Sequence, residues 1–188
     1  MLLASYKSIR PGLQGIGNIA IRFRLNTIYS HSELVFEPGD DVDDLMPDGT
    51  TQPINNELWC GSSVFAERLP ERSPERGGEV GGVRLKRIDV STDKWATRKI
   101  HPAYARRAAE WFVDNQGVGY DYLLIAKYVL WLLPSNKDHL VMCSESVAKA
   151  LGFREPERID PALLHNLVQY LGDYTQPLGS NRWITSST

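Results

Sequence analysis

The stretch Cys143–Gly152, CSESVAKALG, follows a short apolar run at positions 140–142. Glycine is a frequent residue just beyond the end of a helix, so this stretch predicts a short helix that begins at Cys143 and ends before Gly152. A thiol in the first turn of a helix lies beside unpaired backbone amides and the positive end of the helix dipole, and both lower its pKa. Cys143 is therefore a candidate nucleophile. The alternative is a buried, inert cysteine at a helix start.

A thiol nucleophile needs a base within hydrogen-bonding reach, and the chain has four histidines. Three of them have simple structural interpretations: His101 precedes a proline at an expected helix start, His139 lies in a polar loop, and His165 lies in the middle of an expected helix. His31 instead lies near the start of a predicted strand, Ser30–Glu37. A strand can hold an imidazole beside a helix N-terminus, so His31 is the candidate base, although a strand histidine is also often structural.

The first half of the chain carries the signals of an antiparallel sheet. We expect strands at Ser30–Glu37, which a proline–glycine pair ends, at Leu58–Ala66, and at Gly82–Val90, where apolar and charged residues alternate as in a half-exposed strand. Between Glu67 and Gly82 the composition shifts to Glu, Arg, Pro, Ser and Gly, which is typical of a mobile surface insertion. The segment Ile19–Leu25 fits either a strand or a short helix.

The second half of the chain carries helix signals. We expect helices at Pro102–Asn115, at Asp121–Leu133, at Cys143–Leu151, and at Pro161–Leu171 with Asp160 as its N-cap. Strands in the first half and helices in the second predict the α+β class. A length of 188 residues with 42% hydrophobic side chains fits one domain that spans residues 1–188.

The overall composition argues against several classes of protein. The 21 basic and 23 acidic side chains nearly cancel, which gives no sign of a nucleic-acid partner. The N-terminus lacks a secretory signal pattern, and the longest apolar stretch, Tyr122–Leu133, is shorter than the roughly 20 residues of a membrane span. Cys60 and Cys143 match no metal-ligand spacing. We therefore expect a soluble, cytoplasmic protein with two free thiols, no membrane span, no metal and no cofactor.

Five short motifs occur in an order that resembles a known family. They are YSHSELVF at 29–36, GGVRL at 81–85, GYDY at 119–122, CSESVAKALG at 143–152 and IDPALL at 159–164. In this order the chain resembles the circularly permuted branch of the NlpC-type papain-like superfamily, the YiiX/YaeF-like hydrolases. In that branch the histidine precedes the cysteine, as His31 precedes Cys143 here. The resemblance implies a papain-like fold in which an antiparallel sheet packs against helices and the nucleophile begins a helix.

The resemblance also implies roles for three residues. Cys143 is the expected nucleophile, His31 is its expected general base, and Tyr120 is expected near the nucleophile. Tyr120 would donate a hydrogen bond to the developing oxyanion alongside the Cys143 amide, as preorganised donors do in acyl transfer. The alternative for Tyr120 is a packed tyrosine in a Gly-Tyr-Asp turn.

The third catalytic residue, which would hold the imidazole in the correct tautomer, stays open. The family usually supplies a polar residue from the strand after the histidine strand, where this chain has Ser62, Ser63 and Glu67. Glu33 is two residues from His31 and therefore on the same face of its strand, so it is a fourth candidate.

The function that the resemblance implies is thiol-dependent hydrolysis of amide bonds, with cell-wall peptides among the expected substrates. The same chemistry on acyl esters or lipids, as a hydrolase or acyltransferase, is an alternative, because the apolar segment 122–133 could line an acyl-chain groove. A catalytically silent papain-like binding protein is a further alternative. Many relatives with a similar histidine motif are phage proteins, which would fit a cell-wall or host-directed role. The oligomeric state stays open.

Overall fold

The computed structural model describes residues 1–9, 19, 21–23, 25–74, 76–121 and 140–172. Its main sheet has five strands in the order β4-β3-β2-β1-β5, and each pair of neighbours is antiparallel. The strands are β1 (Leu2–Tyr6), β2 (His31–Val35), β3 (Leu58–Arg68), β4 (Val80–Ile88) and β5 (Trp95–Lys99). The fold is therefore α+β with an antiparallel sheet, as the sequence predicts.

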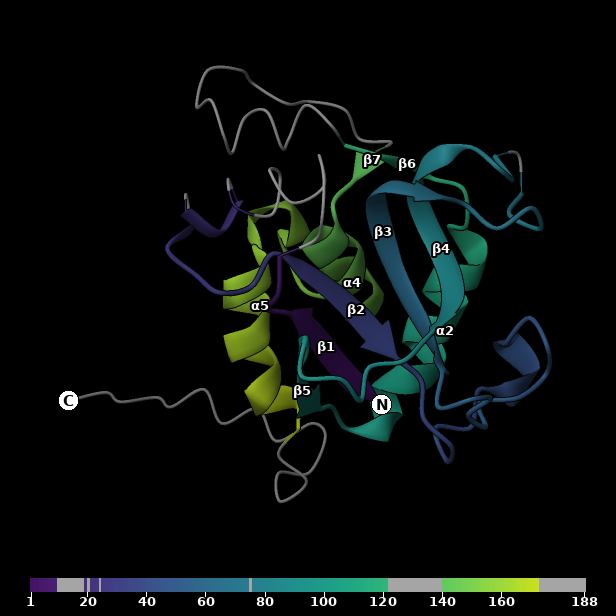
Figure 1. Cartoon of the computed structure of the whole chain (residues 1–188). Coiled ribbons are helices and arrows are strands. Elements are labelled where there is room, and N and C mark those ends of the chain that lie inside the picture. Colours follow the sequence, from purple (N-terminus) through teal and green to yellow (C-terminus); the bar gives the residue numbers. More distant parts are fainter. Residues whose placement is uncertain (10–18, 20, 24, 75, 122–139, 173–188) are drawn as a thin grey trace.

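Helices cover one face of this sheet (Figure 1). The α-helices are α2 (Ala105–Asp114), α4 (Cys143–Leu151) and α5 (Pro161–Leu167). Four 3-10 helices accompany them: η1 (Asp43–Leu45), η2 (Pro102–Tyr104), η3 (Pro156–Arg158) and η4 (Val168–Leu171). Helix α4 packs against β2, β3 and α2, while α5 packs against α4 and β1. A short parallel pair, β6 (Gly119–Tyr120) and β7 (Leu140–Val141), lies just before α4 in the chain order.

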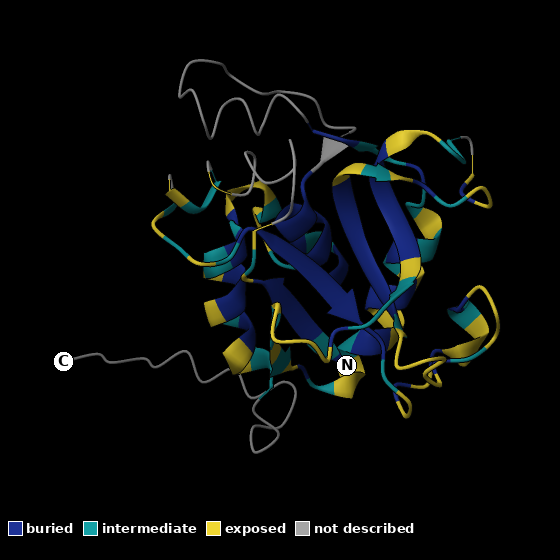
Figure 2. Cartoon of the chain, in the orientation of Figure 1, coloured by how far each residue is buried: buried dark blue, intermediate teal, exposed yellow. Residues whose placement is uncertain are grey.

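Two sets of buried apolar residues follow from the alternation of side chains along the strands. The larger set packs between the sheet and the helices and includes Leu34 of β2, Phe36 just after β2, and Phe112 of α2. The smaller set, on the other face of the sheet, includes Val35 and Cys60. His31 and Glu33 have the same parity as Val35, so their side chains lie on the face of β2 that turns away from the helices. Figure 2 shows that β1 to β4 are buried along most of their length.

Most expected elements are confirmed, with shifted ends. The strand expected at 30–37 spans 31–35, and the one expected at 58–66 extends to residue 68. The strand expected at 82–90 spans 80–88. The helix at 143–151 has the predicted bounds, and Gly152 caps it with a positive φ of 77°. The helices expected at 102–115 and 161–171 each combine an α-helix with a 3-10 helix.

Other expectations have a different outcome. The strands β1 and β5 have no counterpart in the sequence prediction, because five residues with mixed polarity give too little periodicity to recognise. The described residues of 19–25 are helical, which favours the helix alternative. The expected insertion, 67–82, has its two ends inside β3 and β4, and its mobility stays a prediction. The helix expected at 121–133 lies outside the described residues, apart from residue 121.

No helix within the described ranges has the length and apolar character that a bilayer crossing requires.

Close packing between β3 and α2 fixes the distance of the helix layer from the sheet. Gly61 of β3 lies directly against the ring of Phe112, and a Cβ atom at this position would overlap the ring. Glycine at this position therefore lets the strand and the helix approach each other.

We predict that Gly61→Ala lowers the free energy of unfolding by about 1–3 kcal/mol, because the added methyl group overpacks the core. Urea denaturation followed by circular dichroism measures the change. In a Phe112→Leu background, where the smaller side chain leaves room, the same substitution should cost less. An equal cost in both backgrounds would contradict this explanation.

Candidate active site

The start of helix α4 fixes the position of Cys143. Cys143 is the first residue of the helix, and Met142 before it is extended. Glu145 accepts a hydrogen bond from the Met142 amide through Oε2 (3.2 Å) and pairs with Lys149 through Oε1 (2.9 Å). A carboxylate in the first turn and a lysine in the last turn both complement the helix dipole. These contacts define where the helix begins, and so where the thiol lies.

A serine in the same turn ties Cys143 to the sheet. The Ser146 hydroxyl donates to the carbonyl oxygen of Cys143 (2.8 Å) and accepts from the backbone N–H of Ser63 on β3 (3.0 Å). All three residues are buried. This bridge holds the first turn of α4 against β3.

The strands β2 and β3 separate beside this turn. Their pairing includes Leu34 opposite Gly61 and is not continued toward the start of β2. At Ser32 the ladder is replaced by a side-chain bond, in which the Ser62 hydroxyl donates to the Ser32 carbonyl oxygen (2.6 Å). Figure 1 shows β2 and β3 diverging at this end, with α4 visible between them. The separation leaves the Ser32 amide available to a partner other than β3, and that partner is Cys143.

The surroundings of Cys143 favour its thiolate. Burial alone would raise its pKa, but the charge of His31, a hydrogen bond with His31, and the backbone amides of Ser32 and Ser144 outweigh this effect and lower it. Burial, together with the negative charge of Glu33, raises the pKa of Cys60 well above the ordinary value, and the opposing positive charge of Arg84 does not outweigh them. Both thiols are free and buried, so their environments rather than their exposure distinguish them.

His31 lies between two acidic groups. Its Nε2 is 2.7 Å from Oε1 of Glu33, and it is hydrogen-bonded to Cys143 on its other side. Burial lowers the pKa of His31, but the charges of Cys143 and Glu33 overcome this and raise it to about 9. Since a carboxylate oxygen only accepts, Nε2 carries the proton, and Nδ1 is the nitrogen left for the thiol.

Glu33 also forms an ion pair with an arginine that the sequence analysis did not single out. Arg84 of β4 donates from Nη1 to Oε2 (2.9 Å) and from Nη2 to Oε1 (2.7 Å) of Glu33. Burial would raise the pKa of Glu33, but Arg84 and then His31 hold it well below the usual range. Both side chains of this ion pair are 1% exposed. The expectation of a half-exposed face was wrong at Arg84, because pairing with Glu33 makes its burial possible.

Of the four candidates for the third catalytic residue, Glu33 is the one that bonds His31. Ser62 donates to the backbone of β2, and Ser63 binds the Ser146 hydroxyl through its amide. Glu67 pairs with Lys86 of β4 (2.5 Å) and lies 3.4 Å from Nη2 of Arg84. Ser62 and Ser63 thus bond at the gap between β2 and β3, whereas Glu67 lies beside Arg84, the arginine that pairs with Glu33.

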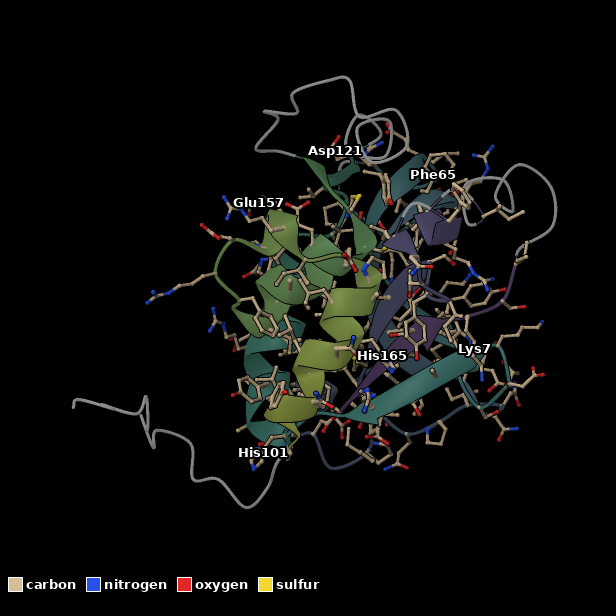
Figure 3. All side chains as sticks on the ribbon, turned by 90° about the vertical axis from the view of Figure 1, so that its left-hand side faces the viewer. Lys7, Phe65, His101, Asp121, Glu157 and His165 are labelled. Atoms are coloured by element: carbon tan, nitrogen blue, oxygen red, sulfur yellow. The ribbon has the colours of Figure 1, made fainter. Side chains whose placement is uncertain are left out.

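Tyr120 lies on β6, which pairs with β7 immediately before the Cys143 helix. Tyr120 is in register with Val141, two residues before Cys143. Its buried ring meets the ring of Phe65 edge-on, with centroids 5.8 Å apart. Figure 3 shows Phe65 and Asp121, the residue after Tyr120, at the same end of the molecule. The role of Tyr120 as an oxyanion donor stays a prediction.

The other histidines have separate surroundings. His101 caps η2 by accepting from the Ala103 amide, and Figure 3 shows it at the opposite end from Phe65. His165 contacts Ser5 (2.9 Å), and His139 lies outside the described residues. Among the residues that the structure describes, no three His, Cys, Asp or Glu side chains form a group that could hold a metal ion.

We predict that Ser146→Ala lowers the free energy of unfolding by about 1–3 kcal/mol, since it leaves the buried Ser63 amide without its acceptor. Ser144→Ala is the matched control, because Ser144 is buried in the same turn and its hydroxyl has no partner among the described residues. Urea denaturation of both variants measures the difference. Equal losses would show that the Ser146 bridge adds no stability.

Comparisons of the chain with protein-family models, with the sequences of curated proteins and with solved structures found no match. The geometry of the site and the motifs of the sequence therefore indicate the function.

Proposed function

We propose that this protein is a thiol-dependent hydrolase of amide bonds, with Cys143 as the nucleophile, His31 as the general base and Glu33 as the residue that orients the imidazole. One observation carries the proposal: the thiol at the start of α4 is hydrogen-bonded to His31, and His31 is bonded to Glu33 through Nε2. This arrangement meets the requirement for an activated nucleophile, which is a base within reach that a third group orients.

In the first half of the proposed reaction, His31 takes the thiol proton and the thiolate of Cys143 attacks the carbonyl carbon of the amide. The carbonyl oxygen becomes an oxyanion, for which amides at the start of α4 and the Tyr120 hydroxyl are the proposed donors. His31 then gives its proton to the leaving amine. The C–N bond breaks, and a thioester remains on Cys143.

In the second half, His31 removes a proton from water, and the hydroxide attacks the thioester carbonyl. The C–S bond breaks, the carboxylic acid product leaves, and the Cys143 thiolate is restored with the proton on His31. Glu33 keeps Nε2 protonated throughout, so that Nδ1 is the nitrogen that exchanges the proton.

We further propose that the fold is a permuted papain-like one. Three features support this: a helix begins with the cysteine, it packs against an antiparallel sheet that carries the histidine, and the histidine comes first in the chain. The motifs that resemble the permuted NlpC-type hydrolases lie in β2, β4, β6, α4 and α5, which surround or support this site.

Amide substrates, including cell-wall peptides, remain the first choice. The alternative of an acyl ester or lipid rests on the apolar segment 122–133, which lies outside the described residues. A silent binding protein would need no activated thiol. The reactivity of Cys143 therefore separates that alternative from both enzymatic ones.

We predict that Cys143→Ala abolishes turnover and leaves the fold intact, because the thiol supplies chemistry and little packing. A panel of muropeptides, isopeptides and acyl esters gives the activity, and thermal denaturation gives the stability. Cys60→Ala, which removes the other buried thiol, is the matched control and should keep its activity. A folded Cys143→Ala variant with wild-type rates would rule out the proposal.

We also predict that iodoacetamide labels Cys143 at pH 6–7 much faster than Cys60. The lowered pKa of Cys143 increases its thiolate fraction in this range, whereas the raised pKa of Cys60 favours the thiol. Mass spectrometry of labelled peptides measures the ratio of labelling at the two cysteines. Slow, equal labelling of both cysteines would favour the binding-protein alternative.

Turnover should decline above about pH 9, because His31 then loses the proton that the leaving amine needs.

A further inference from the structure

We propose that Arg84 is a positioning residue for the Cys143–His31 pair. It fixes the carboxylate of Glu33 beside His31 and supplies the positive charge that keeps the net charge of the buried site at zero when the thiolate forms. This inference rests on the proposed function and extends it to a residue of a third strand. Arg84 is not a catalytic residue in this proposal, because it acts through Glu33.

The geometry sets four groups in one continuous row. Cys143 is hydrogen-bonded to His31, and His31 Nε2 lies 2.7 Å from Glu33 Oε1. The same Oε1 lies 2.7 Å from Nη2 of Arg84, while Oε2 takes the second bond from Nη1 at 2.9 Å. The side chains of His31, Glu33 and Arg84 are 10%, 1% and 1% exposed, so water screens their charges weakly.

The charges of these groups explain why Arg84 is needed. With Arg84 present, the thiolate, imidazolium, carboxylate and guanidinium sum to zero. Without its charge, the same ion pair leaves one net negative charge in a buried site, which is unfavourable. The site relieves this by binding a proton at sulfur, which gives a neutral thiol beside an imidazolium and a carboxylate. In that state Cys143 is not a nucleophile and His31 is not a base.

The form of the contact favours arginine over lysine. Two parallel N–H donors fix the plane of the carboxylate, which a single ammonium group cannot do. Glu33 Oε1 is thereby held toward His31 whether the imidazole is charged or neutral. The Nε atom of Arg84 is buried with no hydrogen-bond partner among the described residues.

The charged groups around Arg84 do not replace its contribution. Glu67 of β3 lies 3.4 Å from Nη2 and is itself neutralised by Lys86 of β4. Cys60 of β3 also faces this region, but its raised pKa keeps it uncharged. Glu33 is therefore the anion that Arg84 balances within the buried site.

The test is the pH dependence of iodoacetamide alkylation at Cys143, measured on the full chain. The acid limb is the pH range in which the alkylation rate rises as the thiolate forms. In Arg84→Met this limb should move to higher pH by about one unit, which lowers the alkylation rate about tenfold at pH values below the midpoint. Arg84→Lys, which keeps the charge without the paired bonds, should move it less. In Glu33→Gln/Arg84→Met both charges are absent, the ion pair is again neutral, and the limb should return toward the wild-type position.

Arg87→Met is the matched control. Arg87 lies on the same strand and makes two hydrogen bonds to Asp48, so its loss also removes an ion pair from β4. It belongs to no group in the row that contains Cys143. The acid limb of this variant should coincide with that of the wild type, even where its stability is reduced.

If Arg84→Met does not fold, Glu33→Gln and the double variant carry the test. Glu33→Gln leaves Arg84 with Glu67 as its remaining carboxylate, and its acid limb should lie at lower pH than that of the double variant. Identical limbs in these two variants, or an unshifted limb in a folded Arg84→Met, would overturn the role of Arg84. An inactive, unreactive wild-type Cys143 would instead overturn the proposed function itself.

Discussion

The buried carboxylate of Glu33 is the constraint on which the rest of the site depends. An isolated carboxylate inside a sheet would take up a proton or unfold the region, so two cationic partners surround it: Arg84 from β4 and the imidazole of His31 from the same strand. The imidazole in turn stabilises a negative charge on Cys143. The ionisation of the thiol is therefore linked to a chain of charges that begins two strands away.

A local break in the sheet gives the thiol access to this chain of charges. Where β2 and β3 separate, the Ser62 hydroxyl takes over the Ser32 carbonyl, and the Ser32 amide binds the sulfur. The Ser146 hydroxyl meanwhile joins the first turn of α4 to the Ser63 amide. The side chains thus satisfy the backbone groups that a regular ladder would have paired, which lets a helix N-terminus occupy the gap without leaving these groups unbonded.

The two cysteines illustrate how far surroundings decide chemistry. Cys60 and Cys143 are both buried and free. Cys60 lies within β3, paired with Val35 and Lys86 of the neighbouring strands, where burial and a nearby carboxylate disfavour its charge. Cys143 lies where amides and an imidazole converge. The difference arises from the ends of secondary-structure elements, where backbone donors are not used by the helix or the sheet.

The sequence by itself determined the α+β class, the bounds of α4, the presence of a strand that contains His31, and the candidates Cys143 and His31, because periodicity, glycine caps and residue spacing are local properties. It left Glu33, Ser62, Ser63 and Glu67 as equal candidates and passed over Arg84 and the strands β1 and β5. Only the tertiary structure decided among these, since the partner of a buried charge comes from a strand that is distant in sequence. An alternating strand pattern assigns faces, but it cannot say which charged side chain on a face is covered and neutralised by a neighbour.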